Sequence, residues 1–424
     1  MPSNTTLPKL PVRLELQETV STDTFRFSVS DEEHPGHRYQ AVDPDGQVWG
    51  FVVVDNTERG PGLGGIRIAP DLTLNEVARL ARAMTLKNSA ACLPYGGGKA
   101  GLIHDPVFLH NNPEYKNELI LKFAEALFPL ESYIPAPDMG TNDHDAQQIY
   151  NYFSERLGTR EHRRGGASRL PETGGIPIDD WGLTAHGLYA AIRILETFFE
   201  DFQIAGSRVV IQGFGNVGHP VAQKLLAEGA CIAGVSDISQ GLYHSSGLNM
   251  DALESAVQKG GLVHYAIDAE YRFPAEQLDR LLEAPCDILI PAARPDAITA
   301  RNADRIDCRR VIQGANAPAN RLTEYYLENR RGIVNYADFI VNVGGVMGCA
   351  VELEMTVDPA YREKVLSAGN SGRSYVENLI YNTVSNNVRW ILEHRPEFAQ
   401  DATFREIALT LAEERLKTPE LTWL

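Results

Sequence analysis

The sequence predicts an α/β protein with two domains, the second of which is built on a doubly wound parallel sheet. The 424 residues exceed one ordinary hydrophobic core. From residue 208 onward, short apolar runs alternate with helical patterns, which is typical of a parallel sheet covered by helices. From about residue 343 the pattern is helical to the end. We therefore expect one domain at residues 1–180, a second at 181–345, and helices at 346–424 that pack back on the first domain.

The composition favours a soluble, cytoplasmic protein and argues against several classes of function. The formal net charge of −17 would repel phosphate backbones, so nucleic acid is not an expected partner. We find no apolar run of membrane-spanning length and no signal peptide. The five cysteines are scattered without a C-x-x-C pair, which favours reduced thiols and predicts neither disulfides nor a metal site.

The first domain should begin with a hairpin and a glycine-rich loop. Residues 39–42 and 47–54 read as two strands around a turn. The segment GPGLGGIRIAP at 60–70 predicts a loop whose backbone passes close to another group, because glycine tolerates such approaches. A helix should follow, capped by Thr73 with Glu76 in a capping box.

The rest of this domain is expected to hold one more helix, two more strands and a solvated loop. YGGGKAGLI reads as a loop leading into a strand, 115–130 as an amphipathic helix, and 133–141 as strand and loop. The basic, glycine-rich stretch at 160–175 reads as a mobile loop before a domain boundary near residue 180.

The second domain contains a pattern typical of dinucleotide binding. A buried strand at 208–212 precedes Gly213, Gly215 and Gly218, a helix follows, and the next strand ends at Asp237. Such glycines allow the tight turn, the approach of a pyrophosphate and close helix packing, with the helix N-terminus facing the phosphate. This predicts a Rossmann-type domain. Asp237 would bind ribose hydroxyls and repel a 2′-phosphate, which favours NAD over NADP.

A nicotinamide cofactor implies hydride transfer, so a substrate site with proton-transfer groups is needed. Lys99 follows three glycines and is a candidate general base, because desolvation and a neighbouring cation would favour its neutral form. The alternative is a surface lysine beside a flexible loop. Asp138 is the available proton partner, or alternatively an ordinary turn aspartate. Lys87 continues a buried helical stripe, which is unusual for lysine.

Five motifs in order resemble the glutamate/leucine/phenylalanine/valine dehydrogenase superfamily. They are GGIRIAPDLTLNEVARLARAMTLKNSAACLPYGGGKAG, PAPDMGT, IQGFGNVG, QGANAP and NVGGV, and they span residues from about 50 to 350. The resemblance implies NAD(P)-dependent oxidative deamination of an L-amino acid to its 2-oxo acid and ammonia. It also implies a two-domain subunit with the active site in the cleft and an N-terminal domain that mediates oligomerisation. The implied homo-oligomer is a hexamer, with an octamer or a dimer as the alternatives.

The resemblance assigns roles by motif. Lys87 would bind the substrate α-carboxylate, Lys99 would activate water, and Asp138 would assist proton transfer. The further substrate residues would be Leu63, Gly64, Gly65, Met84, Asn342, Val346 and Cys349. The cofactor residues would be Thr184, Gly213, Phe214, Gly215, Asn216, Val217, Gly218, Asp237, Ala292, Ala293 and Asn316.

Three departures from the glutamate dehydrogenase pattern affect the expected substrate. Leu63 stands where those enzymes typically have a lysine for the side-chain carboxylate, and Cys349 stands where they have a serine. Met84 matches leucine dehydrogenase-like enzymes. A carboxylate buried against these residues would lose its charge partner. We therefore expect a non-acidic, hydrophobic L-amino acid, with Leu63 as an apolar floor and the glycines bringing the backbone to the substrate.

Two alternatives stay open from the sequence. One is an NAD(P)-dependent glutamate dehydrogenase whose side-chain carboxylate is held elsewhere. The other is a catalytically silent homologue that binds nucleotide and regulates an active relative, against which the presence of Lys87, Lys99 and Asp138 argues.

Overall fold

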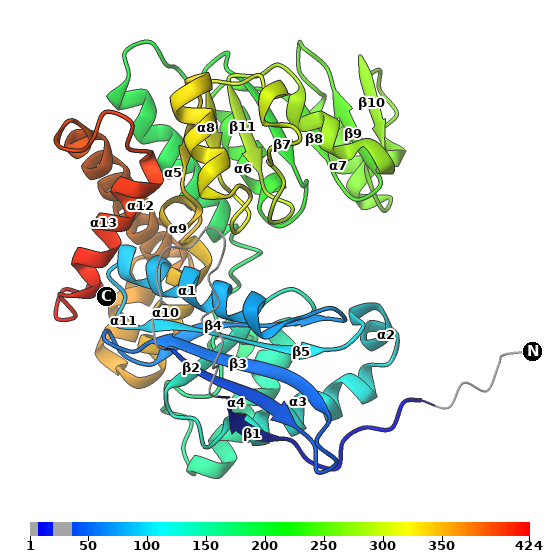
Figure 1. Cartoon of the computed structure of the whole chain (residues 1–424), viewed down its shortest axis with the longest axis vertical. Coiled ribbons are helices and arrows are strands. Elements are labelled where there is room, and N and C mark those ends of the chain that lie inside the picture. Colours follow the sequence, from blue (N-terminus) through cyan, green and yellow to red (C-terminus); the bar gives the residue numbers. More distant parts are fainter. Residues whose placement is uncertain (1–6, 20–35) are drawn as a thin grey trace, which may run out of the picture. The chain divides into compact units, whose positions relative to one another are not determined.

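The chain folds as two compact units. The structure is a computed structural model that describes residues 7–19 and 36–424 (Figure 1). The first unit takes the chain up to Pro177 together with Cys349–Lys364 and Leu416–Leu424. The second unit comprises Ile178–Gly348 and Val365–Arg415. None of the helices in the described part combines the length and apolar character that crossing a membrane requires.

The first unit is organised around a six-stranded mixed sheet. Its strands lie in the order β1-β2-β3-β5-β4-β6. β4 is parallel to both β5 and β6, whereas β3 is antiparallel to β5. The strands are β1 (Glu15–Glu18), β2 (His37–Val42), β3 (Val48–Asn56), β4 (Gly62–Ala69), β5 (Gly96–Ile103) and β6 (Tyr133–Pro137).

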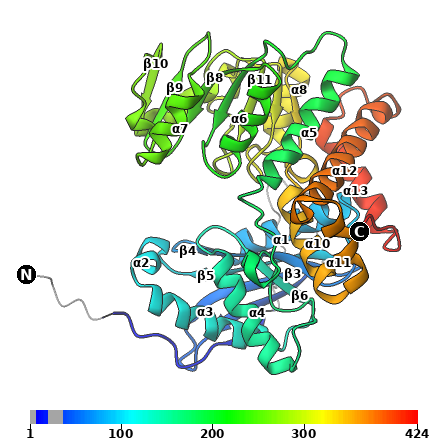
Figure 2. The same ribbon diagram turned by 180° about the vertical axis from the view of Figure 1, so that it is seen from behind.

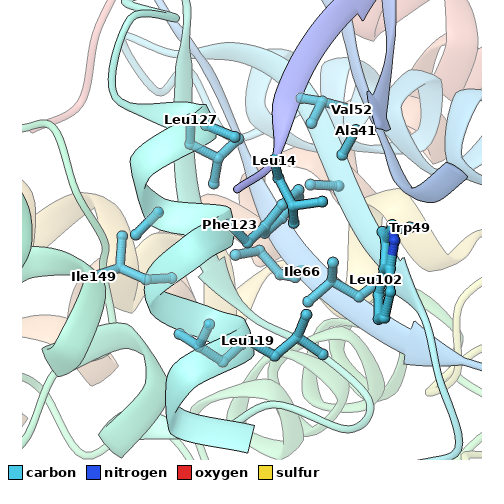
Figure 3. Close-up of a cluster of buried hydrophobic side chains, with 14 of the residues drawn as sticks. Leu14, Ala41, Trp49, Val52, Ile66, Leu102, Leu119, Phe123, Leu127 and Ile149 are labelled. Atoms are coloured by element: carbon cyan, nitrogen blue, oxygen red, sulfur yellow. The ribbon is translucent and has the colours of Figure 1, made fainter. Parts of the chain in front are cut away.

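Helices cover both faces of this sheet (Figures 1 and 2). They are α1 (Leu74–Ala90), α2 (Pro106–Asn111), α3 (Pro113–Leu127) and α4 (Asp143–Leu157). Side chains along β3 alternate between two cores, as expected for a strand buried on both faces. Val52 and Val54 belong to the core with α3 and α4, around Phe123 (Figure 3), whereas Phe51 and Val53 pack with α1.

The glycine-rich segment 60–70 was expected to be a loop, and this is wrong. Residues 62–69 form β4, the strand between β5 and β6. A Cβ atom at Gly62 would lie 2.7 Å from the carbonyl oxygen of Gly97, and one at Gly64 would overlap that of Gly98. These glycines therefore let neighbouring strands approach closely. Likewise, β5 begins at Gly96, inside the stretch read as a loop.

The stretch 160–175 was expected to be a mobile, solvated loop, but it packs into the first unit. Arg169 is only 3% exposed, and its Nε donates to Glu352 Oε1 at 2.7 Å. The other carboxylate oxygen of Glu352 accepts from the amide of Ile176 at 2.8 Å. Burial raises the pKa of Glu352, and the charge of Arg169 opposes that rise. A buried carboxylate with several donors thus fixes this segment.

The second unit contains a seven-stranded sheet in the order β10-β9-β8-β7-β11-β12-β13. β8, β7, β11, β12 and β13 are parallel, and β9 and β10 form an antiparallel edge. This confirms the predicted doubly wound sheet. The strands are β7 (Arg208–Gln212), β8 (Cys231–Ser236), β9 (Gln240–Tyr243), β10 (Tyr271–Pro274), β11 (Ile288–Pro291), β12 (Arg310–Ile312) and β13 (Val334–Tyr336).

Residues 346–424 were expected to pack back on the first domain; Cys349–Lys364 and Leu416–Leu424 belong to the first unit, and Val365–Arg415 belongs to the second. α12 packs against α5, and α13 joins α8 and α9 through ion pairs of Arg405, so both helices stay largely in the second unit. The α-helices that follow residue 178 along the chain are α5 (Leu183–Phe198), α6 (Gly218–Ala227), α7 (Met250–Gln258), α8 (Arg321–Arg331), α9 (Asp338–Val341), α10 (Gly344–Val357), α11 (Pro359–Ser367), α12 (Arg373–His394) and α13 (Phe404–Leu416).

Candidate functional site

The first unit brings Lys99 and Asp138 together and adds an arginine that the sequence analysis did not single out. Lys99 Nζ lies 2.8 Å from Asp138 Oδ2. Arg67 Nε donates to the same oxygen at 3.0 Å. The side chains of Arg67, Lys99 and Asp138 are 8%, 5% and 16% exposed. One buried carboxylate oxygen of Asp138 therefore pairs with two cations.

The strand order places these three groups side by side. Arg67 lies on β4, Lys99 on β5, and Asp138 directly after β6. Gly65 occupies the middle strand, where a Cβ would lie 2.7 Å from Asp138 Cβ and 2.5 Å from the carbonyl oxygen of Pro137. The glycine thus keeps room for the carboxylate beside β4.

The turn after β6 fixes the position of Asp138. Its amide donates to Thr141 Oγ1 at 2.8 Å, and Thr141 Oγ1 donates to the carbonyl of Ile66 at 2.7 Å. Gly140 adopts a φ of +85°, and a Cβ there would lie 2.7 Å from Ile68 Cβ. The PDMGT motif is therefore a turn tied to β4.

The two cations control the ionisation of Asp138. Burial alone would raise the pKa of its carboxyl group, but the charges of Lys99 and Arg67 and their hydrogen bonds hold that pKa well below the usual range. Arg67 also donates through Nη1 to Glu76 Oε1 at 2.8 Å. Asp138 is therefore an anion at physiological pH, anchored from both sides.

The remaining expected substrate residues of the first unit lie along α1, β4 and α10. Lys87 on α1 is buried, and Met84 Cγ lies 3.3 Å from where a Cβ at Gly64 would be. Leu63 is 0% exposed and pairs with Gly97 on β5. Cys349 on α10 is buried. The glycines face neighbouring protein atoms, so their contact with substrate stays a prediction.

The second unit places the G-x-G-x-x-G turn between β7 and α6. Gly213 has a φ of +93° and lies against Ala293, and a Cβ at Gly218 would overlap the carbonyl of Gly213. Gly215 has open space where a Cβ would stand. Phe214 is buried, whereas Asn216 is exposed and donates to Asp179 Oδ2 at 2.8 Å. Val217 is the N-cap of α6. The helix N-terminus and the open space beside Gly215 fit a pyrophosphate.

Asp237 directly follows β8, and its carboxylate already has protein donors. Oδ1 accepts from the amide of Ser239 at 2.7 Å, from its hydroxyl at 2.6 Å and from the amide of Gln240 at 2.9 Å. Oδ2 accepts from the amide of Leu262 at 2.6 Å. Burial would raise the pKa of Asp237, but these hydrogen bonds lower it. Asp237 therefore holds the backbone at Ser239–Gln240 and at Leu262 in place, and it also adds a negative charge after β8.

A second cluster gathers at the carboxyl ends of the central strands. Asn342 Nδ2 donates to the carbonyl of Gly314 at 3.1 Å and lies 3.3 Å from Asn316 Oδ1. Gly314 packs against Ala292, and Thr184 Oγ1 lies 3.1 Å from where a Cβ at Gly345 would be. Among the described residues, the buried Oδ1 of Asn342 has no hydrogen-bond partner. That acceptor fits a ligand with an N–H group.

Val346 is the last of the expected substrate residues, and it lies buried near the start of α10. The expected residues are thus divided between the two units. Arg67 is the functional candidate that the sequence analysis missed, although it stands inside the quoted motif GGIR. The sequence signal for a role of Arg67 was weak, because its contact with Asp138 becomes visible only when the pairing of β4 with β6 is known.

Comparison with known proteins places the chain in a family. The model of the Glutamate/Leucine/Phenylalanine/Valine dehydrogenase family matches residues 174–368, and the model of the Glu/Leu/Phe/Val dehydrogenase dimerisation domain matches residues 37–155. The fold and these matches define an amino acid dehydrogenase, an oxidoreductase. The chain belongs to the Glu/Leu/Phe/Val dehydrogenase family, as its motifs predicted.

Several relatives of this chain are glutamate dehydrogenases. The NADP-specific glutamate dehydrogenase of Saccharolobus shibatae is 33% identical over 85% of this chain and 82% of its own. The glutamate dehydrogenase of Thermotoga maritima is 35% identical over 70% of each. The hetero-hexameric glutamate dehydrogenase of Thermus thermophilus in its Leu-bound form shares the fold, with a TM-score of 0.74, 24% identity, and coverage of 96% and 89%.

These relatives bear on the expected substrate and cofactor. They favour glutamate, the alternative considered above, over the hydrophobic amino acid expected from Leu63. The coarser expectations of amino acid oxidation and a nicotinamide cofactor are supported. The name of the Saccharolobus enzyme gives NADP, so the preference for NAD stays a prediction.

Proposed function

We propose that this protein catalyses the reversible NAD(P)-dependent oxidative deamination of L-glutamate to its 2-oxo acid and ammonia. The relatives at 33–35% identity support the substrate. The observation on which the chemistry rests is the buried cluster in which Lys99 and Arg67 share one oxygen of Asp138.

Within this proposal, the first unit binds the substrate and handles protons. Lys87, a buried cation on α1, binds the α-carboxylate. Lys99 holds and releases the proton of the water that attacks the imine, and Asp138 orients the Lys99 ammonium and the substrate amine. The carboxylate of Asp138 stays ionised throughout, because its low pKa makes it an anchor rather than a proton store.

The second unit supplies the cofactor site in this proposal. A nicotinamide cofactor, when bound, would supply the acceptor for the hydride that leaves the substrate α-carbon. The amides from Gly215 to Gly218 bind the pyrophosphate, and the unpartnered Oδ1 of Asn342 accepts an N–H from the nicotinamide carboxamide or the substrate amine. Thr184 and Asn316 would border the nicotinamide. NAD is the proposed cofactor because the negative charge of Asp237, directly after β8, would repel the 2′-phosphate of NADP.

A second candidate substrate, an apolar L-amino acid, is favoured by one observation. Leu63 is fully buried on β4, and Met84 lies against the same strand. Neither residue offers a charge partner for a side-chain carboxylate, so a glutamate enzyme must hold that group with another cation.

Formation of NADH at 340 nm across the L-amino acids, with NADP in parallel, separates the candidates. Preferential oxidation of glutamate supports the main proposal, whereas preferential oxidation of leucine, valine or phenylalanine replaces it with the second. A protein that binds NAD yet oxidises no amino acid would contradict both and favour the regulatory homologue.

We also propose a homo-oligomer, with a hexamer favoured, because residues 37–155 match a model described as a dimerisation domain. The molar mass measured by light scattering as the protein elutes from a size-exclusion column tests this proposal. A monomer at micromolar concentration would contradict it.

A further inference from the structure

We propose that Arg67 is a positioning residue of the reaction, which balances the charge of Asp138 and so lets Lys99 give up its proton. This inference rests on the proposed function, in which Lys99 acts on water. No role for Arg67 follows from the motif resemblance itself.

Arg67 and Lys99 compete for one atom. Arg67 Nε and Lys99 Nζ lie 3.0 and 2.8 Å from Asp138 Oδ2. The guanidinium is held in this orientation from its other side, because Nη1 donates to Glu76 Oε1 at 2.8 Å. Glu76 lies in the first turn of α1, so the helix and β4 together aim Arg67 at Asp138.

The charge balance gives this geometry a chemical meaning. A buried lysine paired one-to-one with a carboxylate is stabilised as an ammonium, and such an ammonium is a poor base. A guanidinium stays charged at every accessible pH. With Arg67 on the same oxygen, the attraction between Asp138 and Lys99 is offset by repulsion from a permanent cation. Proton loss from Lys99 then leaves Asp138 still paired.

Other titratable groups around Asp138 do not supply this balance. Tyr133 on β6 has a pKa raised well above its ordinary value, first by burial and then by the charge of Asp138, so it stays neutral. Glu76 is an anion that pairs with the far side of Arg67. Lys99 and Arg67 are the charged groups that lower the pKa of Asp138.

A purely structural ion pair would behave differently on mutation. Loss of a structural Arg67 would reduce stability and scale activity down equally at every pH. Loss of a charge-balancing Arg67 moves the acid limb of the pH profile, because Lys99 must give up its proton to act on water and a lone pair with Asp138 holds that proton more tightly.

The test is the pH profile of kcat/KM for amino acid oxidation in the full-length Arg67→Gln variant. The acid limb should move upward by about one pH unit or more, since the loss of a neighbouring unit charge shifts proton affinity by that amount. Arg67→Lys keeps the charge and should hold the acid limb near its wild-type position. Glu76→Gln, the matched control, removes the other partner of Arg67 and should leave the acid limb in place.

The free energy of unfolding is a second measurement, which needs no cofactor and can be made even if the variant is poorly active. Asp138 stabilises the fold above its unfolded pKa, and this stability is lost as the pH falls. The difference in unfolding free energy between wild type and Arg67→Gln should therefore be largest at neutral pH and shrink below about pH 4.

The outcomes are distinguishable. A folded Arg67→Gln variant with lower activity and an unmoved acid limb overturns the inference about Arg67. A wild type that oxidises no amino acid overturns the proposed function instead, and the unfolding measurement then still decides whether Arg67 controls the charge of Asp138.

Discussion

Arg405 forms an ion pair with Asp338, with Nη2 and Oδ1 2.9 Å apart, and the other oxygen of Asp338 accepts the amide of Ala317 at 2.8 Å. Ala317 adopts a φ of +46°, which is uncommon for a residue with a side chain. It follows Asn316, one of the proposed cofactor residues. Helix α13 thereby holds a strained turn beside the proposed nicotinamide site.

Substitution of Arg405 should therefore affect both stability and cofactor binding. Arg405→Met leaves Asp338 and Glu324 as buried anions without their cation, which costs about 3–5 kcal/mol. We expect this loss in urea unfolding and a raised KM for the cofactor. Arg395→Met is the control, because Arg395 is one-third exposed and lies 3.6 Å from Glu328. Equal effects of the two substitutions would contradict the prediction.

Glu328 should make stability fall as the pH rises. Burial raises the pKa of its carboxyl group to about 7, against hydrogen bonds from the amides of Phe404 and Asn335. A carboxyl group whose pKa is raised on folding stabilises the fold below its unfolded pKa of 4.5, and this stability is lost as the pH rises toward 7.

The measurement is the unfolding free energy between pH 5 and 8. Wild type should lose on the order of 2 kcal/mol over this range from Glu328. Glu328→Gln has no such titration, so its profile should be flatter by that amount. Parallel profiles would show that Glu328 is ionised at all these pH values.

Asp237 should influence cofactor choice through its charge. Its oxygens already accept hydrogen bonds from Ser239, Gln240 and Leu262, so the negative charge is held in place. Asp237→Asn should raise the ratio of kcat/KM for NADP over NAD by about fivefold or more, because removing one charge near a phosphate is worth at least about 1 kcal/mol.

Asp287→Asn is the charge-matched control for this prediction. Asp287 precedes β11, at the amino ends of the parallel strands, whereas Asp237 follows β8 at their carboxyl ends. The control should leave the cofactor ratio unchanged. An unchanged ratio in Asp237→Asn as well would mean that cofactor choice lies elsewhere.

Leu63→Lys should produce a protein that glutamate stabilises. Leu63 is fully buried, so a lysine there loses hydration without a partner and should cost about 3–5 kcal/mol. A substrate side-chain carboxylate beside it would restore part of that loss. We expect a lower Tm that L-glutamate raises and L-leucine does not. Leu63→Met, of similar volume, should change stability by less than about 1.5 kcal/mol.

A rise in Tm with leucine rather than glutamate would place residue 63 outside the side-chain pocket. The same result would remove the observation that favours an apolar substrate in the wild-type protein.

The sequence predicted the second sheet better than the first. Its strands are apolar runs separated by helical patterns, and these signals are local, as at RVVIQ and CIAGVS. β4 was mistaken for a loop because glycines are poor strand formers in isolation. Its glycines are required by the backbones of β5 and β6, which lie far along the chain.

In the candidate site, too, residues in local motifs could be predicted from the sequence, whereas contacts that depend on strand pairing could not. Lys99 and Asp138 were found through motifs, and their contact was an expectation that the structure supports with a distance of 2.8 Å. Arg67 could not be paired with Asp138 from periodicity, because the pairing depends on the register that sets Ile66 opposite Pro137. The ion pairs of Arg405 join segments that no local pattern connects.

The order of strands in the first sheet also determines when the protein becomes active after synthesis or refolding. Arg67, Lys99 and Asp138 come from β4, β5 and the turn after β6, and whole helices separate these strands along the chain. No hairpin can assemble them, because parallel strands pair only after long segments have closed, which makes such steps slow. Helical structure should therefore return early during refolding, and catalytic activity should return only with the last strand pairings.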